Sequence, residues 1–285
     1  MSLTPPDRAV VSRSVAAALA EDLGAEGDVT TRAVVPATRR GGATFVAREP
    51  MVVAGLAVAE EVFRQLDPSI EFTARLTDGE ATVAGTIVAS AVGPARALLE
   101  GERTALNFLQ RMSGIATATR GAVEEIAGTG ATILDTRKTA PGLRALDKYA
   151  VTAGGGRNHR LGLYDAAMIK DTHLGAGGSV TEAIAACRAA GLKRDAITAE
   201  VRSVEELDEA IAAGAGRALL DNMSLDMLAA CVRRGKGKII LEASGGLRPG
   251  TLRSVAETGV EFLSLGYLTH SVRAADLAMD LEARN

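Results

Sequence analysis

The apolar positions of this 285-residue chain follow two patterns, and the change comes near residue 131. Before it, residues 8–23 have apolar positions at helical spacing. Residues 41–54 and 70–92 contain short apolar runs between Gly, Asp and Pro turns, which is typical of strands. The segment LAVAEEVFRQL (56–66) between them predicts a helix. The first third of the chain therefore predicts a small α+β domain.

A long helical segment follows Pro94 and continues to about residue 128. It predicts a helix that carries the chain into a second domain. Gly114 lies in the middle of this segment, and we expect it to break or kink the helix, because glycine destabilises a helix interior.

From residue 131 a short apolar run, a turn and an amphipathic helix alternate. The runs are ATILDT (131–136), AAMIKD (166–171), AITAEV (196–201), RALLD (217–221), KIILEA (238–243) and EFLSLG (261–266), and helices are expected at 179–190, 204–213, 224–234 and 248–258. Apolar runs with little alternation indicate strands that are covered on both faces, and their alternation with helices indicates a parallel sheet. The patterns GxGxxG and GxxxxGK[ST] are both missing, which favours a barrel over an open nucleotide-binding sheet.

Charged or glycine-rich segments end all six runs, and the carboxyl ends of barrel strands converge on one mouth. We therefore expect a shared site there, to which the segment GGGRNHR (154–160) also contributes. The candidate residues are Arg137, Lys138, His159, Arg160 and Lys170 with positive charge, Glu200 and Asp221 with negative charge, and Ser244, Gly245, Gly246 and Gly266 as small residues.

The charge is distributed unevenly along the chain. Net charge is −3, but residues 137–170 hold seven Lys and Arg and only two acids, so that this window is +5 and the remainder −8. This distribution fits a small anionic ligand better than a nucleic acid. No apolar stretch approaches the about 18 residues of a membrane span, and the N-terminus does not resemble a signal peptide, so we expect a cytoplasmic protein without a membrane partner.

These residue types suit a pair of ligands. Arginine grips carboxylates and phosphates through two bonds, lysine acts as a point charge, and a glycine-rich turn can bind a phosphate with backbone N–H groups. Glu200 and Asp221 suit Mg²⁺ or sugar hydroxyls. The set therefore indicates glycosyl or phosphoribosyl transfer.

Several further residues have weaker patterns. Spacing alone places Arg103 and Arg111 at a surface or an interface, and Arg144 and Lys148 on a helix surface. Arg157 could be either structural or functional. We expect His270 near the site and His173 behind Lys170; Cys187 and Cys231, without a CxxC motif, are expected in the core.

Longer motifs resemble those of one family. The segment DTRKTAPGLRALDKYAVTAGGGRNHRLGLYDAAMIKDTH is similar to the signature of the quinolinate phosphoribosyltransferases. Further similar segments are EDLGAEGDVTT, GERTALNFLQRMSGIAT, LLDNMS, LEASGGL and LGYLTHSV, in the family's order from about residue 21 to 273. The resemblance implies that quinolinate and phosphoribosyl pyrophosphate (PRPP) give nicotinate mononucleotide, pyrophosphate and CO₂ in de novo NAD synthesis, with Mg²⁺ and without an organic cofactor.

The resemblance also implies roles for residues. Quinolinate would be bound by Arg103, Arg137, His159, Arg160 and Lys170, and PRPP by Thr136, Lys138, Glu200, Asp221, Ser244, Gly245, Gly246, Gly266 and His270. Lys138, Lys170, Glu200 and Asp221 would carry the chemistry, with Glu200 and Asp221 available to Mg²⁺. Arg103 would enter the neighbouring subunit's site, which implies a homodimer or a hexamer.

The implied fold is an α/β sandwich domain (1–112, joined by a C-terminal helix at 273–285) and an incomplete, seven-stranded parallel α/β barrel (113–272), whose seventh strand is expected near GGGRNHR. The family usually has two acids in the third strand; here Thr198 replaces the first, and Thr172 replaces an Asn. Three alternatives are a non-catalytic anion-binding relative, a nicotinate phosphoribosyltransferase without decarboxylation, and a phosphate-binding barrel enzyme of amino-acid biosynthesis.

Overall fold

The computed structural model describes residues 3–284, which form two compact units. Unit 1 contains residues up to 120, residues 139–155 and residues from 268 onward, and unit 2 contains residues 121–138 and 156–267. Both units are discontinuous in sequence. The domain boundary expected between residues 112 and 113 lies inside the long helix Ala95–Glu125. The division into these two discontinuous units does not test that boundary.

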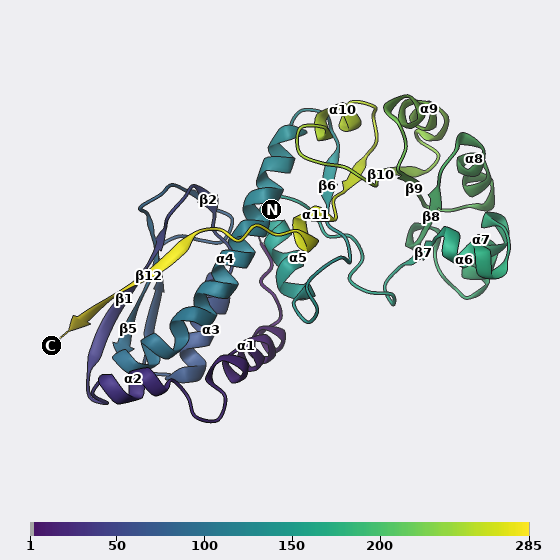
Figure 1. Cartoon of the computed structure of the whole chain (residues 1–285). Coiled ribbons are helices and arrows are strands. Elements are labelled where there is room, and N and C mark those ends of the chain that lie inside the picture. Colours follow the sequence, from purple (N-terminus) through teal and green to yellow (C-terminus); the bar gives the residue numbers. More distant parts are fainter. Residues whose placement is uncertain (1–2, 285) are drawn as a thin grey trace. The chain divides into compact units, whose positions relative to one another are not determined.

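Unit 1 contains a four-stranded antiparallel sheet in the order β12-β1-β5-β3 (Figure 1). The bounds are Arg40–Ala47 for β1, Glu71–Ala74 for β3, Ile87–Pro94 for β5 and Leu277–Arg284 for β12. The helix expected at 273–285 is wrong. Leu277 and Met279 are buried and alternate with more exposed neighbours, and this period of two is that of a strand. Two further short strands, β2 (Met51–Val52) and β4 (Ala81–Thr82), pair with each other.

Helices accompany this sheet in unit 1. They are α1 (Arg8–Leu23), α2 (Val29–Val34), α3 (Leu56–Leu66), α4 (Ala95–Glu125) and α5 (Arg144–Ala153), and α4 and the short α11 (Tyr267–His270) each cross from one unit to the other. Phe63 of α3 packs on Phe45 and Phe72 of the sheet, with ring centroids 5.8 and 6.1 Å away. Phe45 and Phe63 are fully buried and belong to the apolar core of unit 1.

The break expected at Gly114 is absent, because α4 continues from Ala95 to Glu125. A Cβ atom on Gly114 would lie 2.1 Å from the backbone oxygen of Arg273. The glycine therefore lets the chain that leads into β12 pass close against the helix. The backbone hydrogen bonds of the long helix on either side of Gly114 compensate for its low helix propensity.

Unit 2 contains a six-stranded parallel sheet in the order β6-β11-β10-β9-β8-β7, and the expected fold class is confirmed. The strands are β6 (Thr132–Leu134), β7 (Ala167–Ile169), β8 (Ile197–Val201), β9 (Arg217–Asp221), β10 (Ile240–Ser244) and β11 (Phe262–Ser264), one in each predicted run. Helices α6 (Asp171–Gly177), α7 (Val180–Ala189), α8 (Val204–Ala213), α9 (Leu225–Gly235) and α10 (Leu252–Ala256) and the 3₁₀ turn η1 (Arg194–Ala196) connect them. Figure 1 shows α7, α8, α9 and α10 on the outer side of these strands.

The seventh strand is reduced to a single bridge. Leu134 at the end of β6 pairs in parallel with Arg157, which lies in the GGGRNHR segment where this strand was expected. The backbone N–H of Arg157 donates to Ile133 (2.9 Å), and that of Asp135 donates to Arg157 (3.2 Å). This bridge fixes GGGRNHR beside the carboxyl end of β6.

Two smaller expectations concern helices and cysteines. No helix among residues 3–284 is long and apolar enough to cross a bilayer. Both cysteines are free thiols; Cys231 is buried as expected, whereas Cys187 is only half-buried.

Candidate active site

The register of the parallel strands brings charged residues together at their carboxyl ends. Ile169 pairs with Ala199, so the next residues, Lys170 and Glu200, lie side by side, with Nζ 3.5 Å from Oε2. Asp221 pairs with Ser244 at the ends of β9 and β10. The sheet thus places a basic and an acidic candidate in contact and a second acid beside the glycine turn.

His159 is held from three sides. Its backbone N–H donates to the fully buried carboxylate of Asp135 (2.8 Å), and its Nδ1 accepts from the backbone N–H of Arg160 (2.6 Å). Its Nε2 lies 3.3 Å from Oε1 of Glu242. Since Nδ1 is an acceptor, the ring proton belongs on Nε2, where it faces the Glu242 carboxylate.

Glu242 is fully buried in β10 and anchors this cluster. Arg217 donates to its second oxygen (2.8 Å), and the Ser264 hydroxyl donates to the oxygen that His159 also approaches. Burial would raise the pKa of Glu242, but its hydrogen bonds with His159 and Ser264 and the positive charge of Arg217 hold that pKa below its ordinary value. Glu242 is therefore an ionised group at the base of the site.

Arg137 and Arg160 form a concentrated positive charge. Burial lowers the pKa of Arg160, and repulsion from Arg137 lowers it further, against an opposing contribution from Asp165. Arg160 also donates to the backbone oxygen of Ala166 (2.8 Å), which orients its guanidinium. Two guanidinium groups that repel each other form a site that a dianion would stabilise.

The turn after β10 has a backbone that suits glycine. Gly245 and Gly246 have φ of 91° and 64°, in the left-handed region. A Cβ atom on Gly245 would lie 2.4 Å from the side chain of Asn222. Asn222, itself at φ 54°, donates from its backbone to Ser244 (2.9 Å) and from its amide to Asp221 (2.8 Å). Asn222 thus ties the second acid to the glycine turn.

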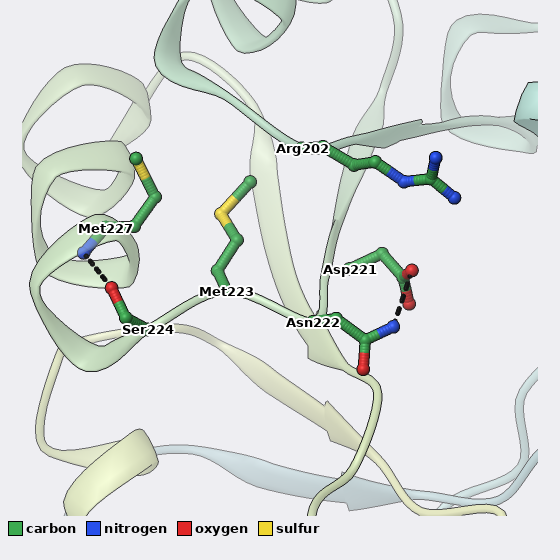
Figure 2. A pocket seen from close by; sticks show the side chains of 6 residues that line it. All are labelled: Arg202, Asp221, Asn222, Met223, Ser224 and Met227. Carbon is green, nitrogen blue, oxygen red and sulfur yellow. Dashed lines mark hydrogen bonds between the residues drawn. The ribbon is translucent and has the colours of Figure 1, made fainter.

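A pocket of about 450 Å³ opens beside this turn (Figure 2). Its lining comes from the loop after β8, the end of β9 and the first turn of α9, and the lining residues are Arg202, Asp221, Asn222, Met223, Ser224 and Met227. In Figure 2 the guanidinium of Arg202 and the carboxylate of Asp221 point toward the same side of the pocket. A charged pocket therefore adjoins the predicted PRPP residues.

Other predicted residues have the following places. The Thr136 hydroxyl accepts from the backbone of Lys138 (3.1 Å), and His173 accepts from the backbone of Lys170 (3.0 Å) through Nδ1, behind it as expected. Gly266 follows β11 in unit 2. Arg103 and His270 belong to unit 1 and are exposed.

Of three residues of unit 1 that were expected at a surface or an interface, one is buried and two are half-buried. Lys148 is 1% exposed, and Arg144 is half-buried and donates to the Thr139 hydroxyl (3.1 Å). Arg111 donates from Nε and Nη2 to the fully buried Asp147 (2.8 and 2.7 Å). Helical spacing places a residue on a face, but it does not reveal the buried partner that makes burial of a charge possible.

Sequence reasoning assigned no role to Asn222, Glu242 or Arg202. A glutamate inside the apolar run KIILEA is the signal for Glu242, because a charge there must have buried partners. Arg202 follows Val201, which pairs with Leu220. Its place opposite Asp221 depends on the strand register, which the sequence does not show.

Two parts of the chain match known families. Residues 28–113 match the family described as "Quinolinate phosphoribosyl transferase, N-terminal domain", and residues 115–280 match "Quinolinate phosphoribosyl transferase, C-terminal domain". The chain belongs to the quinolinate phosphoribosyltransferase family. The similarity that the motifs indicated is thereby confirmed over most of the chain.

Relatives match this chain over nearly its whole length. A Bacillus subtilis protein named "Probable nicotinate-nucleotide pyrophosphorylase [carboxylating]" is 44% identical over 93% of this chain and 91% of its own length. The Arabidopsis thaliana "Nicotinate-nucleotide pyrophosphorylase [carboxylating], chloroplastic" is 38% identical over 99% of this chain and 86% of its own. The solved structure of the Francisella tularensis nicotinate-nucleotide pyrophosphorylase, 37% identical, superposes with a TM-score of 0.92 over 99% of both chains.

Proposed function

We propose that this quinolinate phosphoribosyltransferase carries out the reaction of its family at the carboxyl ends of β6 to β11. It transfers the phosphoribosyl group of PRPP to quinolinate and yields nicotinate mononucleotide, pyrophosphate and CO₂ for NAD biosynthesis. The observation that supports this most directly is the contact between Lys170 and Glu200, at 3.5 Å. It joins a basic region suited to a dicarboxylate to an acidic region suited to a ribose.

Quinolinate binds in the basic region. Its two adjacent carboxylates accept from Arg137, Arg160 and Lys170, and the like charges of Arg137 and Arg160 are neutralised by the dianion. His159, whose ring Glu242 orients, lies beside them. These contacts hold the ring so that its nitrogen faces the anomeric carbon of PRPP, which makes the attack effectively unimolecular.

PRPP binds across the acidic region and the glycine turn. The 5-phosphate is bound by backbone N–H groups of Gly245, Gly246 and Gly266 with the Ser244 hydroxyl, and the family resemblance also assigns His270 to PRPP. Glu200 and Asp221 accept from the ribose hydroxyls, and Lys138, beside Thr136, stabilises the departing pyrophosphate. The ring nitrogen forms its bond to the anomeric carbon as the bond to pyrophosphate breaks.

Mg²⁺ fits this arrangement as an ion that arrives with PRPP. Among residues 3–284 no group of three or more His, Cys, Asp and Glu could hold a metal ion, so the chain offers no complete cage. Glu200 and Asp221 can supply one or two carboxylate ligands, and Mg²⁺ takes the rest from phosphates and water. Bound there, the ion would neutralise charge on the diphosphate.

Decarboxylation needs no organic cofactor. Once the ring nitrogen carries ribose, the pyridinium ring is positively charged. The bond from ring carbon 2 to its carboxylate then breaks, CO₂ departs, and the electron pair stays on the ring beside the cationic nitrogen. A proton finally adds to that carbon. The intermediate thus supplies the electron sink that a cofactor would otherwise provide.

Arg103 extends the proposal to the assembly. It is exposed on α4, apart from the candidate residues of unit 2 along the chain, and the family resemblance assigns it to the site of a neighbouring subunit. A homodimer with shared sites follows. Mixing inactive Arg103→Ala with inactive Arg137→Ala should restore activity in mixed dimers, whereas sites confined to single chains would show none.

The first experiment measures CO₂ release from carboxyl-labelled quinolinate with PRPP and Mg²⁺, with each component omitted in turn. We expect release that requires all three and an equal amount of nicotinate mononucleotide. Binding of nicotinate in preference to quinolinate, or anion binding without release, would contradict the proposal.

A further inference from the structure

Arg202 follows the last residue of β8 and stands among three carboxylates. The register of β8 and β9, in which Val201 pairs with Leu220, brings Arg202 opposite Asp221. Its Nη2 lies 2.9 Å from Oδ2 of Asp171 and 3.5 Å from Oε1 of Glu200. Its backbone N–H donates to Glu206 (2.7 Å) in the first turn of α8, so both ends of the residue are anchored.

Glu200 has a cation at each oxygen. Oε2 lies 3.5 Å from Nζ of Lys170, and Oε1 lies 3.5 Å from Nη2 of Arg202. The Glu200 side chain is only 8% exposed, whereas that of Arg202 is 53% exposed. A carboxylate with so little access to water needs a cationic partner to stay in place.

The two cationic side chains beside Glu200, Lys170 and Arg202, behave differently during the proposed reaction. In the proposed function Lys170 turns to a carboxylate of quinolinate, which removes it from Oε2. Arg202 is bonded to Asp171, which is not one of the predicted quinolinate residues, and would keep its contact with Glu200. The guanidinium also points toward the same side of the pocket as the carboxylate of Asp221 (Figure 2).

We infer that Arg202 is a positioning residue for phosphoribosyl transfer, which holds the Glu200 carboxylate in place for the ribose hydroxyls while Lys170 is engaged by quinolinate. The inference rests on the proposed function. If the inference holds, PRPP binding depends on Arg202 most strongly when a dicarboxylate occupies the quinolinate site. The pair of Arg202 with Asp171 is exposed at both ends and by itself would contribute little.

The test is PRPP binding by calorimetry with Mg²⁺, with and without saturating phthalate. Phthalate has the two adjacent carboxylates of quinolinate but a carbon in place of the attacking nitrogen, so no transfer occurs. For Arg202→Gln we expect PRPP to bind roughly tenfold more weakly in the presence of phthalate, since a charge-assisted bond is lost. Without phthalate the loss should be smaller, because Lys170 still holds Glu200. Arg202→Lys should recover part of the affinity.

The matched control is Arg234→Gln. Arg234 also forms an ion pair with an aspartate, Asp208, and is 54% exposed, but it lies on α9. The Arg234→Gln variant should bind PRPP with the affinity of the wild type. Unchanged PRPP affinity of Arg202→Gln with phthalate, or equal losses with and without it, would overturn the inference. A wild-type protein that releases no CO₂ from quinolinate would instead overturn the proposed function, and the inference with it.

Discussion

Nε2 of His159 lies 3.3 Å from Oε1 of Glu242, a fully buried carboxylate that Arg217 and Ser264 also contact. Replacement of Glu242 by Gln removes the charge and leaves Arg217 without its ionic partner. We expect a loss of about 3 kcal/mol in the free energy of unfolding at pH 7, measured with a chemical denaturant, because breaking a buried pair is costly. Glu257→Gln, which breaks an exposed pair with Arg253, should cost at most about 1 kcal/mol.

The contribution of Glu242 to the free energy of unfolding should decrease as the pH falls. Its pKa in the folded protein is below its ordinary value of 4.5, so its stabilisation is complete above pH 4.5 and is lost as the pH falls through the lowered value. The difference in unfolding free energy between wild type and Glu242→Gln should therefore shrink below pH 4.5. A difference that stays constant from pH 7 down to acid unfolding would contradict an ionised Glu242.

Arg160→Lys should weaken quinolinate far more than PRPP. Lysine keeps the charge but cannot make the two parallel bonds of a guanidinium, so we expect a loss of roughly ten- to a hundredfold in quinolinate affinity. Calorimetry with each ligand measures this. Arg188→Lys, an exposed change on α7, should leave both affinities unaltered. Equal losses for both ligands after Arg160→Lys would argue against its assignment to quinolinate.

Gly245→Ala should impair PRPP binding. The added Cβ would lie 2.4 Å from Asn222, so the turn or Asn222 must move. Gly250→Ala is the matched control, because Gly250 has a similar φ of 85° but no atom within 4 Å of the added carbon. Both changes should destabilise the fold by roughly 1 kcal/mol through backbone strain. Only Gly245→Ala should raise the Kd for PRPP, by about tenfold or more, and a similar rise in both variants would show that the clash is unimportant.

Gly114→Ala should destabilise unit 1 although it improves helix propensity. The new Cβ would lie 2.1 Å from the backbone oxygen of Arg273, which cannot move independently of the chain leading into β12. We expect a loss of roughly 3 kcal/mol in unfolding free energy. Gly121→Ala in the same helix has open space and should gain about 0.5–1 kcal/mol. A gain for both variants would mean that the chain near Arg273 adapts.

Regular elements could be predicted from the sequence because their patterns are local. Each of the six apolar runs of unit 2 contains a strand, and α3 (Leu56–Leu66) occupies the predicted segment. Long-range contacts explain the errors. The burial of Lys148 and of Asp147, the partner of Arg111, depends on the surrounding tertiary structure, and the segment at 277–284 is a strand because β1 is there to pair with it.

The candidate site was predictable in part. Strand ends identified Lys170, Glu200 and Asp221, because parallel strands share one carboxyl edge. Register decided what the sequence could not show, namely that Lys170 contacts Glu200 and that Arg202 stands opposite Asp221. The assignments to quinolinate and PRPP, the homodimer, the Mg²⁺ ligands and the cytoplasmic location stay predictions.

The pairing of β12 with β1 over eight residue pairs has a consequence for biosynthesis. During translation β1 leaves the ribosome early, but its neighbour follows only after the whole of unit 2 has been made. One edge of β1 therefore stays open while the parallel sheet folds, and open strand edges favour association with other chains. When the protein is overexpressed, nascent chains that stall before residue 277 should therefore aggregate more than complete chains.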